Sequence, residues 1–355
     1  MSVSKVIVSR LAHVHYQHPD LRQAAAFLRD FGLIEEEKVG NRSYLRGYGA
    51  QPYIYVAEPS PDSERRFLGA YWVVDTREEL EKAAELPGAT AIQTLEGPGQ
   101  GEVVTVIDPN GNLVGFVYGQ ELREVNSQGG GLEQSSGQVS NIVVDKGRKG
   151  TFRRFDIGPS PVHKLGHYGY MVPVDKFEET LAWYTSVINL KPTDCVYDPK
   201  TGKDETCFMH IDLGATYTDH HSFFLGVSST ANKAHIHHSS FEVNDFDTQS
   251  LGHDYLRSKG WTNCWGLGRH VLGSQIFDYW FDGSGNVVEH YSDGDLVNED
   301  TPLGREAAAP NTLYIWGPNI PLGFVTGRVE DAGKPLPMPP DVVAGVPAKI
   351  SAGGA

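Results

Sequence analysis

The sequence repeats itself, and this repeat is the feature that most limits how the chain can fold. The segment Asp108-Pro-Asn-Gly-Asn-Leu-Val-Gly115 aligns with Asp282-Gly-Ser-Gly-Asn-Val-Val-Glu289, and Leu11-Ala-His13 aligns with Leu165-Gly-His167. Matching segments at corresponding places indicate a duplicated structural unit. We therefore expect two related halves, each built from the same succession of strands and helices.

Each half divides again into two units, in which a strand is followed by a helix and then by short strands. In the first unit Asp20 opens a helix that Gly32 ends. In the third unit Asp175 opens a helix, with Glu178 three residues later as in a capping box. The pattern predicts an α+β fold with an N-terminal domain over 1–120, a Gly- and Ser-rich connector over 121–160, a C-terminal domain over 161–295 and a Pro-rich extension over 296–355.

Composition excludes several classes of partner. The 355 residues include 30 Lys and Arg against 45 Asp and Glu, so the net charge is −15. This charge disfavours binding to nucleic acid or to an anionic membrane surface. No run of 18 apolar residues and no signal-like start is found, and the three cysteines form no Cys-x-x-Cys pair. We therefore expect a cytoplasmic protein.

The stretch from Tyr279 to Glu289 is predicted to be a hairpin. Residues 282–286 are turn formers, and aromatic and β-branched residues flank them. Because Tyr279 and Glu289 each lie five residues from Ser284, a hairpin would place them opposite one another, roughly 5–8 Å apart. A glutamate beside two valines on a strand is unusual, because buried carboxylates are normally paired or bound to metal.

Two histidines on predicted strands complete a candidate metal site with this glutamate. His167, His238 and Glu289 come from the first strand of the third unit and from the first and last strands of the fourth. Two histidines and one carboxylate form a facial triad that holds a divalent metal and leaves positions open. Since side chains alternate along a strand, Gly169 and Ser240 share faces with the two histidines and are expected to leave room beside the metal. A single strand histidine is more often a hydrogen-bonded core residue, but two histidines and a glutamate on these three strands make a coincidence much less likely.

These segments resemble the type I extradiol ring-cleaving dioxygenases, the catechol 2,3-dioxygenase (metapyrocatechase) group of the vicinal oxygen chelate superfamily. The resemblance covers residues from about 10 to 295, and its specific matches follow residue 160. Ile236-His-His-Ser-Ser-Phe241 resembles the His-His-x-x-Phe segment, whose second histidine is a metal ligand. Phe281-Asp-Gly-Ser-Gly-Asn-Val-Val-Glu289 resembles the signature that ends in the metal glutamate, with Asp-Gly in place of the usual Asp-Pro.

The resemblance implies four βαβββ modules in two domains, the vicinal oxygen chelate or glyoxalase–bleomycin-resistance–dioxygenase fold, with metal only in the C-terminal domain. It implies Fe(II), with Mn(II) as an alternative, and a catechol and dioxygen as substrates of extradiol cleavage in aromatic catabolism. It makes His221, chosen over His220, the acid–base group, and it makes His270 and Tyr279 hydrogen-bonding partners of substrate oxygens. Four-module chains of this family usually form homo-oligomers.

Two other functions fit the same fold. The first is a non-catalytic protein that sequesters an aromatic ligand, since the N-terminal half has Gly115 where the C-terminal half has Glu289 and so shows that ligands can be lost. The second is a glyoxalase-type isomerase, which normally draws a second glutamate from the other module. The presence of His221, His270 and Tyr279 together argues against sequestration, and the lack of a glutamate at Gly115 argues against the isomerase.

Overall fold

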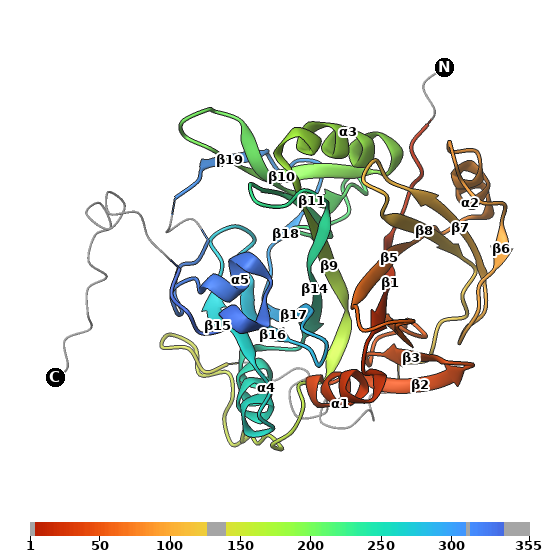
Figure 1. Ribbon diagram of the computed structural model, residues 1–355. Helices are drawn as coiled ribbons and strands as arrows, with labels where there is room; N and C mark the ends of the chain where they lie inside the picture. The colour runs from red at the N-terminus through yellow and green to blue at the C-terminus, as the bar shows by residue number, and fades with distance from the viewer. Residues whose placement is uncertain (1–3, 126–139, 310–312, 337–355) are drawn as a thin grey trace.

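The computed structural model describes residues 4–125, 140–309 and 313–336, which form two sheets (Figure 1). The N-terminal sheet has the strand order β2-β3-β4-β1-β5-β8-β7-β6. Its first module comprises β1 (Arg10–His18), α1 (Leu21–Phe31), β2 (Ile34–Val39), β3 (Arg42–Arg46) and β4 (Tyr55–Pro59). Its second comprises β5 (Arg66–Val73), α2 (Arg77–Ala84), β6 (Gln93–Thr94), β7 (Glu102–Ile107) and β8 (Leu113–Tyr118).

The C-terminal sheet repeats this plan, with the order β15-β16-β17-β14-β9-β13-β11-β10-β19. The third module comprises β9 (Val162–Pro173), the 3-10 turn η2 (Val174–Lys176), α3 (Phe177–Val187), β10 (Leu190–Tyr197), β11 (Asp204–Ile211), β12 (Thr218–Asp219) and β13 (Phe223–Ser228). The fourth comprises β14 (His235–Val243), α4 (Phe246–Ser258), β15 (Asn263–Arg269), β16 (Ile276–Phe281) and β17 (Val287–Ser292). The predicted fold class, α+β with four βαβββ modules, is confirmed.

Strand pairing makes the duplication visible. In each sheet the first strands of the two modules pair antiparallel at the centre, β1 with β5 and β9 with β14. Within each module the first strand runs parallel to the last, as in the pairs β1–β4, β5–β8, β9–β13 and β14–β17. Each curled sheet therefore brings the first and last strands of its modules together, which is where the candidate ligands lie.

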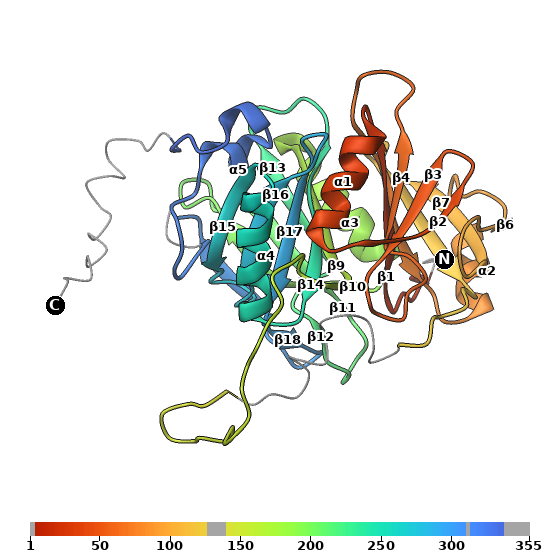
Figure 2. The ribbon, with the colours of Figure 1, turned by 90° about the horizontal axis from the view of Figure 1, so that it is seen from below.

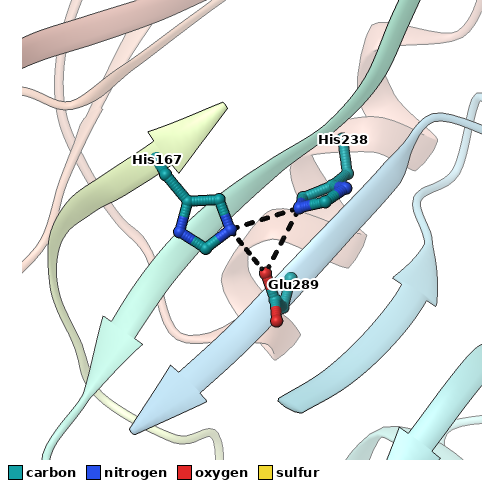
Figure 3. A group of neighbouring side chains, drawn as sticks. All are labelled: His167, His238 and Glu289. Atoms are coloured by element: carbon teal, nitrogen blue, oxygen red, sulfur yellow. Dashed lines mark hydrogen bonds and ion pairs between the residues drawn. The ribbon is translucent and has the colours of Figure 1, made fainter. Parts of the chain in front are cut away.

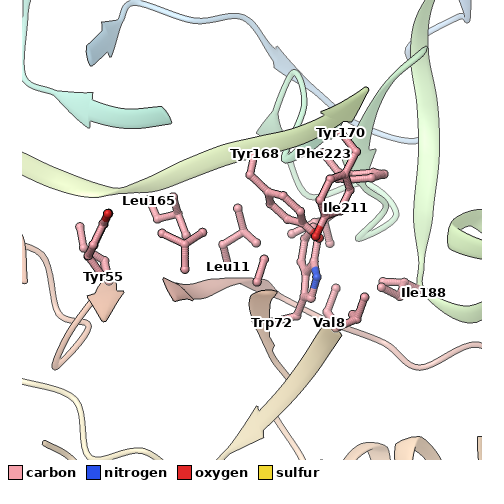
Figure 4. Packing of buried hydrophobic residues seen from close by; sticks show 14 of the residues in the cluster. Val8, Leu11, Tyr55, Trp72, Leu165, Tyr168, Tyr170, Ile188, Ile211 and Phe223 are labelled. Atoms are coloured by element: carbon pink, nitrogen blue, oxygen red, sulfur yellow. The ribbon is translucent and has the colours of Figure 1, made fainter. Parts of the chain in front are cut away.

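The two halves share one hydrophobic core between their sheets (Figure 4). Trp72 of β5 faces Tyr168 of β9 with ring centroids 5.8 Å apart. The hydroxyl groups of Tyr16 and Ser239 lie 2.7 Å apart across the same boundary. Helices α1 and α4 lie next to each other at one end of the molecule, whereas α3 lies at the opposite end (Figures 1 and 2).

Helix starts were predicted with mixed success. Asp20 caps α1 by accepting a hydrogen bond from the Gln23 N–H, and Gly32 ends that helix in the left-handed region at φ 110°. The capping box at Asp175 is wrong, because residues 174–176 form a 3-10 turn and α3 begins at Phe177 without a side-chain cap. The chain thus enters α3 through this tighter turn, and neither Pro173 before the turn nor Lys176 before the helix makes a side-chain cap hydrogen bond.

The segments outside the four modules contribute unequally. Residues 140–161 contain neither helix nor strand, and the rest of the connector, 126–139, lies outside the described residues. Beyond β18 (Leu296–Val297), β19 (Gly304–Ala307) extends the C-terminal sheet by pairing with β10, and α5 (Leu322–Thr326) and the 3-10 turn η3 (Val329–Asp331) follow. The proline-rich run from 337 onward is outside the described residues. Among the helices that are described, none is both long and apolar enough to span a bilayer.

Candidate active site

The predicted hairpin forms, and Asp282 holds its turn. Oδ1 of Asp282 accepts hydrogen bonds from the backbone N–H groups of Ser284 and Asn286, and Oδ2 accepts one from the Asn286 side-chain amide. Tyr279 and Glu289 are direct cross-strand partners in β16 and β17. Asp108 makes the corresponding bonds in the N-terminal half, so the turn chemistry is duplicated together with the sequence.

His167, His238 and Glu289 meet where β9, β14 and β17 lie side by side (Figure 3). The Nε2 atoms of the two histidines are 3.2 Å apart, and they lie 3.0 and 3.4 Å from Oε2 of Glu289. The strand register explains why these side chains come together, because Ser240 of β14 pairs with His167 of β9 on one side and with Glu289 of β17 on the other. The structure therefore brings together the three residues that the sequence suggested as ligands.

The arrangement fits a divalent metal. Ligand atoms bound at about 2.1 Å and at right angles would be about 3 Å apart, which agrees with the observed separations. Glu289 is fully buried, and within the described chain neither of its carboxylate oxygens has a hydrogen-bond partner of ordinary geometry. Burial alone would raise the pKa of Glu289, but the imidazoles of His167 and His238 outweigh it and hold the pKa well below its usual range. An ionised, buried and unsatisfied carboxylate beside two imidazoles is the donor set of a metal site.

Gly169 is predicted to leave room beside the metal, but another side chain of the protein occupies that room. Gly169 does lie next to the site, but a Cβ there would overlap the ring of Phe224. That ring stands 5.0 Å, centroid to centroid, from the ring of His238. The glycine thus admits an aromatic side chain of the protein itself, which packs against the candidate ligand.

His221 and His220 have different surroundings. The ring of His221 lies 4.1 Å from that of His167, whereas His220 contacts Asp194 through Nε2 at 2.6 Å. Burial, and after it the imidazole of His167, hold the pKa of His221 well below its usual range. His221 is thus the one of the two whose ring lies beside the candidate ligand His167, and this position favours His221 over His220 for the acid–base role.

His270 and Tyr279 form a pair at the other side of the triad. Nε2 of His270 and the Tyr279 hydroxyl are 2.9 Å apart, and Nε2 lies 4.0 Å from Oε1 of Glu289. The backbone carbonyl of Leu313 accepts a hydrogen bond from Nδ1 at 2.6 Å, so Nδ1 carries the hydrogen. Burial lowers the pKa of His270 to about 4 and raises that of Tyr279 well above its usual range.

Residues near the site that sequence reasoning missed come from distant segments. Phe324 of α5 packs against His237, Trp265 and Tyr279, with ring centroids 4.7–4.9 Å apart. Leu313 and Phe324 both belong to the stretch expected to be an irregular extension. No local pattern identifies either residue, because both act through contacts with residues far away in the chain.

In the N-terminal half, tyrosine side chains occupy the position that corresponds to the candidate metal site. The ring of His13, the counterpart of His167, lies 4.1 Å from that of Tyr71 and 4.7 Å from that of Tyr53. A Cβ on Gly115, the counterpart of Glu289, would overlap the Tyr71 ring. Among the described residues, the C-terminal triad is the one group of three or more His, Cys, Asp or Glu side chains whose ligand atoms lie close enough together to hold a metal ion.

Comparison with known proteins gives three kinds of match. A model of the Glyoxalase/Bleomycin resistance protein/Dioxygenase superfamily matches residues 164–290. Metapyrocatechase 2 of Cupriavidus necator is 28% identical over 330 residues, which are 90% of this chain and 92% of that protein. Two solved structures resemble the whole fold. Homoprotocatechuate 2,3-dioxygenase from Brevibacterium fuscum, in complex with 3,4-dihydroxyphenylacetate, has a TM-score of 0.73 at 17% identity and covers 92% of this chain and 94% of its own.

The second is an Mn(II)-bound glyoxalase from Novosphingobium aromaticivorans, with a TM-score of 0.70 at 19% identity, covering 89% of this chain and 93% of its own. At these identities the structures establish the fold. The family match falls on the two modules that carry the triad, and the metapyrocatechase match runs through nearly the whole chain. The resemblance inferred from the sequence is therefore confirmed: the chain is similar to a metapyrocatechase over nearly its whole length, and its residues 164–290 match the Glyoxalase/Bleomycin resistance protein/Dioxygenase superfamily.

Proposed function

We propose that this protein cleaves the ring of a catechol next to its two hydroxyl groups, with dioxygen as the second substrate, at one Fe(II) ion held by His167, His238 and Glu289. The observation that carries the proposal is the buried carboxylate of Glu289, which has two imidazole nitrogens at 3.0 and 3.4 Å and no ordinary hydrogen bond among the described residues. A structural role does not require a buried acid in this state.

The bound metal would supply a Lewis-acidic centre with open positions at which the diol and dioxygen come together. His221 takes a proton from the substrate and returns it later in the reaction, because its ring lies beside the triad at 4.1 Å from that of His167. Tyr279, whose raised pKa keeps its hydroxyl protonated, donates that hydrogen to the bare Nε2 of His270, and its oxygen accepts a hydrogen bond from a substrate hydroxyl. His270, adjacent to that hydroxyl, orients it and completes the polar wall of the site.

Fe(II) is our assignment of the metal, and the donor set also suits Mn(II). Two imidazoles and one carboxylate, the groups that His167, His238 and Glu289 supply, are the donor set typical of a non-haem Fe(II) facial triad. The solved Mn(II)-bound glyoxalase of similar fold makes Mn(II) the natural competitor. Anaerobic loading with each ion separately distinguishes them by which one restores turnover.

We also propose a homo-oligomer in a reducing, cytoplasmic setting. Val143, Val144, Phe152 and Ile157 are 70–90% exposed, and such apolar side chains in one segment are typical of a contact with another chain. The three cysteines are all buried and free, as is usual in a reducing compartment. Size measurement in solution tests the assembly directly.

The experiment that tests the proposed activity is oxygen uptake with a panel of catechols, using anaerobically prepared protein loaded with Fe(II). We expect uptake to be accompanied by a coloured semialdehyde or keto-acid product, and we expect both to be lost in His221→Gln, which keeps all three proposed ligands. If loaded wild-type protein binds a catechol and returns it unchanged, the protein sequesters aromatic ligands and the proposal is wrong.

A further inference from the structure

A second cluster of titratable side chains lies behind His221 and has no part in the triad. Asp194 of β10 lies 2.6 Å from Nε2 of His220, through its Oδ2. Nδ1 of His220 in turn lies 3.1 Å from Nδ1 of His221. The three side chains form a hydrogen-bonded row from a carboxylate that is 18% exposed to an imidazole that is 4% exposed and touches His167.

Several strands and loops hold this row in place. The backbone N–H of His220 donates to the Asp295 carbonyl at 2.9 Å, and its carbonyl accepts a hydrogen bond from the Thr193 hydroxyl at 2.8 Å. Gly304 of β19 is the strand partner of Asp194, and a Cβ there would overlap the Asp194 carboxylate. A Cβ on Gly273 would come within 2.9 Å of the His220 ring. Contacts from β10, β19 and two loops therefore restrain the pair, which a solvated surface pair does not require.

The chemistry of the pair restricts where its hydrogens lie. An ionised carboxylate only accepts, so Nε2 of His220 carries a hydrogen that points at Asp194. In the neutral imidazole Nδ1 is then bare, and it accepts the hydrogen from Nδ1 of His221. Since His221 then carries its hydrogen on Nδ1, its Nε2 is the bare nitrogen and is free to act on a group in the site.

We propose that Asp194 and His220 are positioning residues that fix the ring orientation and the tautomer of His221. The inference rests on the proposed acid–base role of His221, and it explains why a second histidine precedes it. It also gives β19 a structural role, because Gly304 of that strand leaves the space in which the Asp194 carboxylate lies.

The test is Asp194→Asn, which keeps the shape of the side chain but adds a donor. The amide allows the reverse arrangement, in which it donates to Nε2 of His220 and the hydrogen on Nδ1 of His220 points at His221. Nitrogen-15 NMR of the metal-free protein should show His221 with its hydrogen on Nδ1 in the wild type and a shift towards the Nε2–H form in the variant. The matched control is Asp219→Asn, since Asp219 precedes His220 in sequence but pairs with Lys164 instead.

Kinetics provide the second readout. We expect Asp194→Asn to lower kcat about 10- to 100-fold, the usual cost of losing a group that orients a ligand or a base. KM should change by less than about twofold, and bound metal should stay at about one per chain. His220→Gln serves as a second variant if Asp194→Asn folds poorly. An Nε2–H tautomer of His221 in the wild type would overturn the inference, and so would equal loss of kcat and metal content in the variant. The NMR result stands even if no catechol is cleaved, in which case only the proposed function fails.

Discussion

Gly169→Ala tests how the packing of the site supports its ligands. The new Cβ would lie inside the ring of Phe224, whose two nearest carbons it would meet far below the usual contact of about 3.5–4.0 Å. The ring therefore has to move by more than about 1 Å. Because Phe224 is buried against the rings of His238 and Phe208, it has no free space to move into.

Overpacking of this kind costs about 1–3 kcal/mol of unfolding free energy. We expect the denaturant midpoint to fall accordingly, and we expect metal affinity to fall with it, because the displaced ring pushes on His238. Gly158→Ala is the matched control, since it makes the same chemical change at a site with nothing within 4 Å. Adding Phe224→Leu to Gly169→Ala should recover part of both losses. Equal midpoints and metal affinities for the two single variants would refute the reasoning.

Three further predictions concern neighbouring groups. Tyr279→Phe should lower kcat about 10- to 100-fold with metal content unchanged, since a lost hydrogen bond to a reacting oxygen costs about 1–3 kcal/mol; unchanged steady-state kinetics would count against its role. Although burial alone would lower the pKa of His253, its hydrogen bond to Asp278 raises that pKa above 6.5. This stabilisation is fully present below pH 6.5 and is lost as pH rises through the folded-state pKa, so the stability deficit of His253→Gln should shrink between about pH 6 and about pH 9; a deficit that grows over this range would contradict the assignment. His13→Ala should leave metal content at about one per chain, because its ring is packed between tyrosines; a lower metal content in the variant than in the wild type, measured by elemental analysis, would show that the N-terminal half also binds metal.

Local chemistry explains which features the sequence could predict. The turn of Asp282 is made by side chains two to four residues away, and a two-residue period places Tyr279 opposite Glu289. Duplication then shows that His167 corresponds to His13, whereas His238 follows from the resemblance of residues 236–241 to the His-His-x-x-Phe segment. The failed capping box at Asp175 shows the limit of such reasoning, because residues 174–176 form a 3-10 turn and α3 begins only after it.

Features that depend on distant contacts could not be predicted. The room beside Gly169 is occupied by Phe224 from β13, and nothing near Gly169 in sequence indicates this. The Asp194 carboxylate that holds His220 lies on a strand 26 residues earlier. The carbonyl that fixes His270 belongs to Leu313, which is 43 residues away. Each is a tertiary contact between residue types that occur everywhere in the chain.

The central claim is that His167, His238 and Glu289 hold one metal ion. Its most direct test is the metal content of purified protein, measured by elemental analysis for wild type and Glu289→Ala after identical anaerobic loading with Fe(II). We expect about one iron per chain in the wild type and almost none in the variant, because the variant removes the one charged ligand. Equal metal content in both proteins, or none in either, would contradict the account.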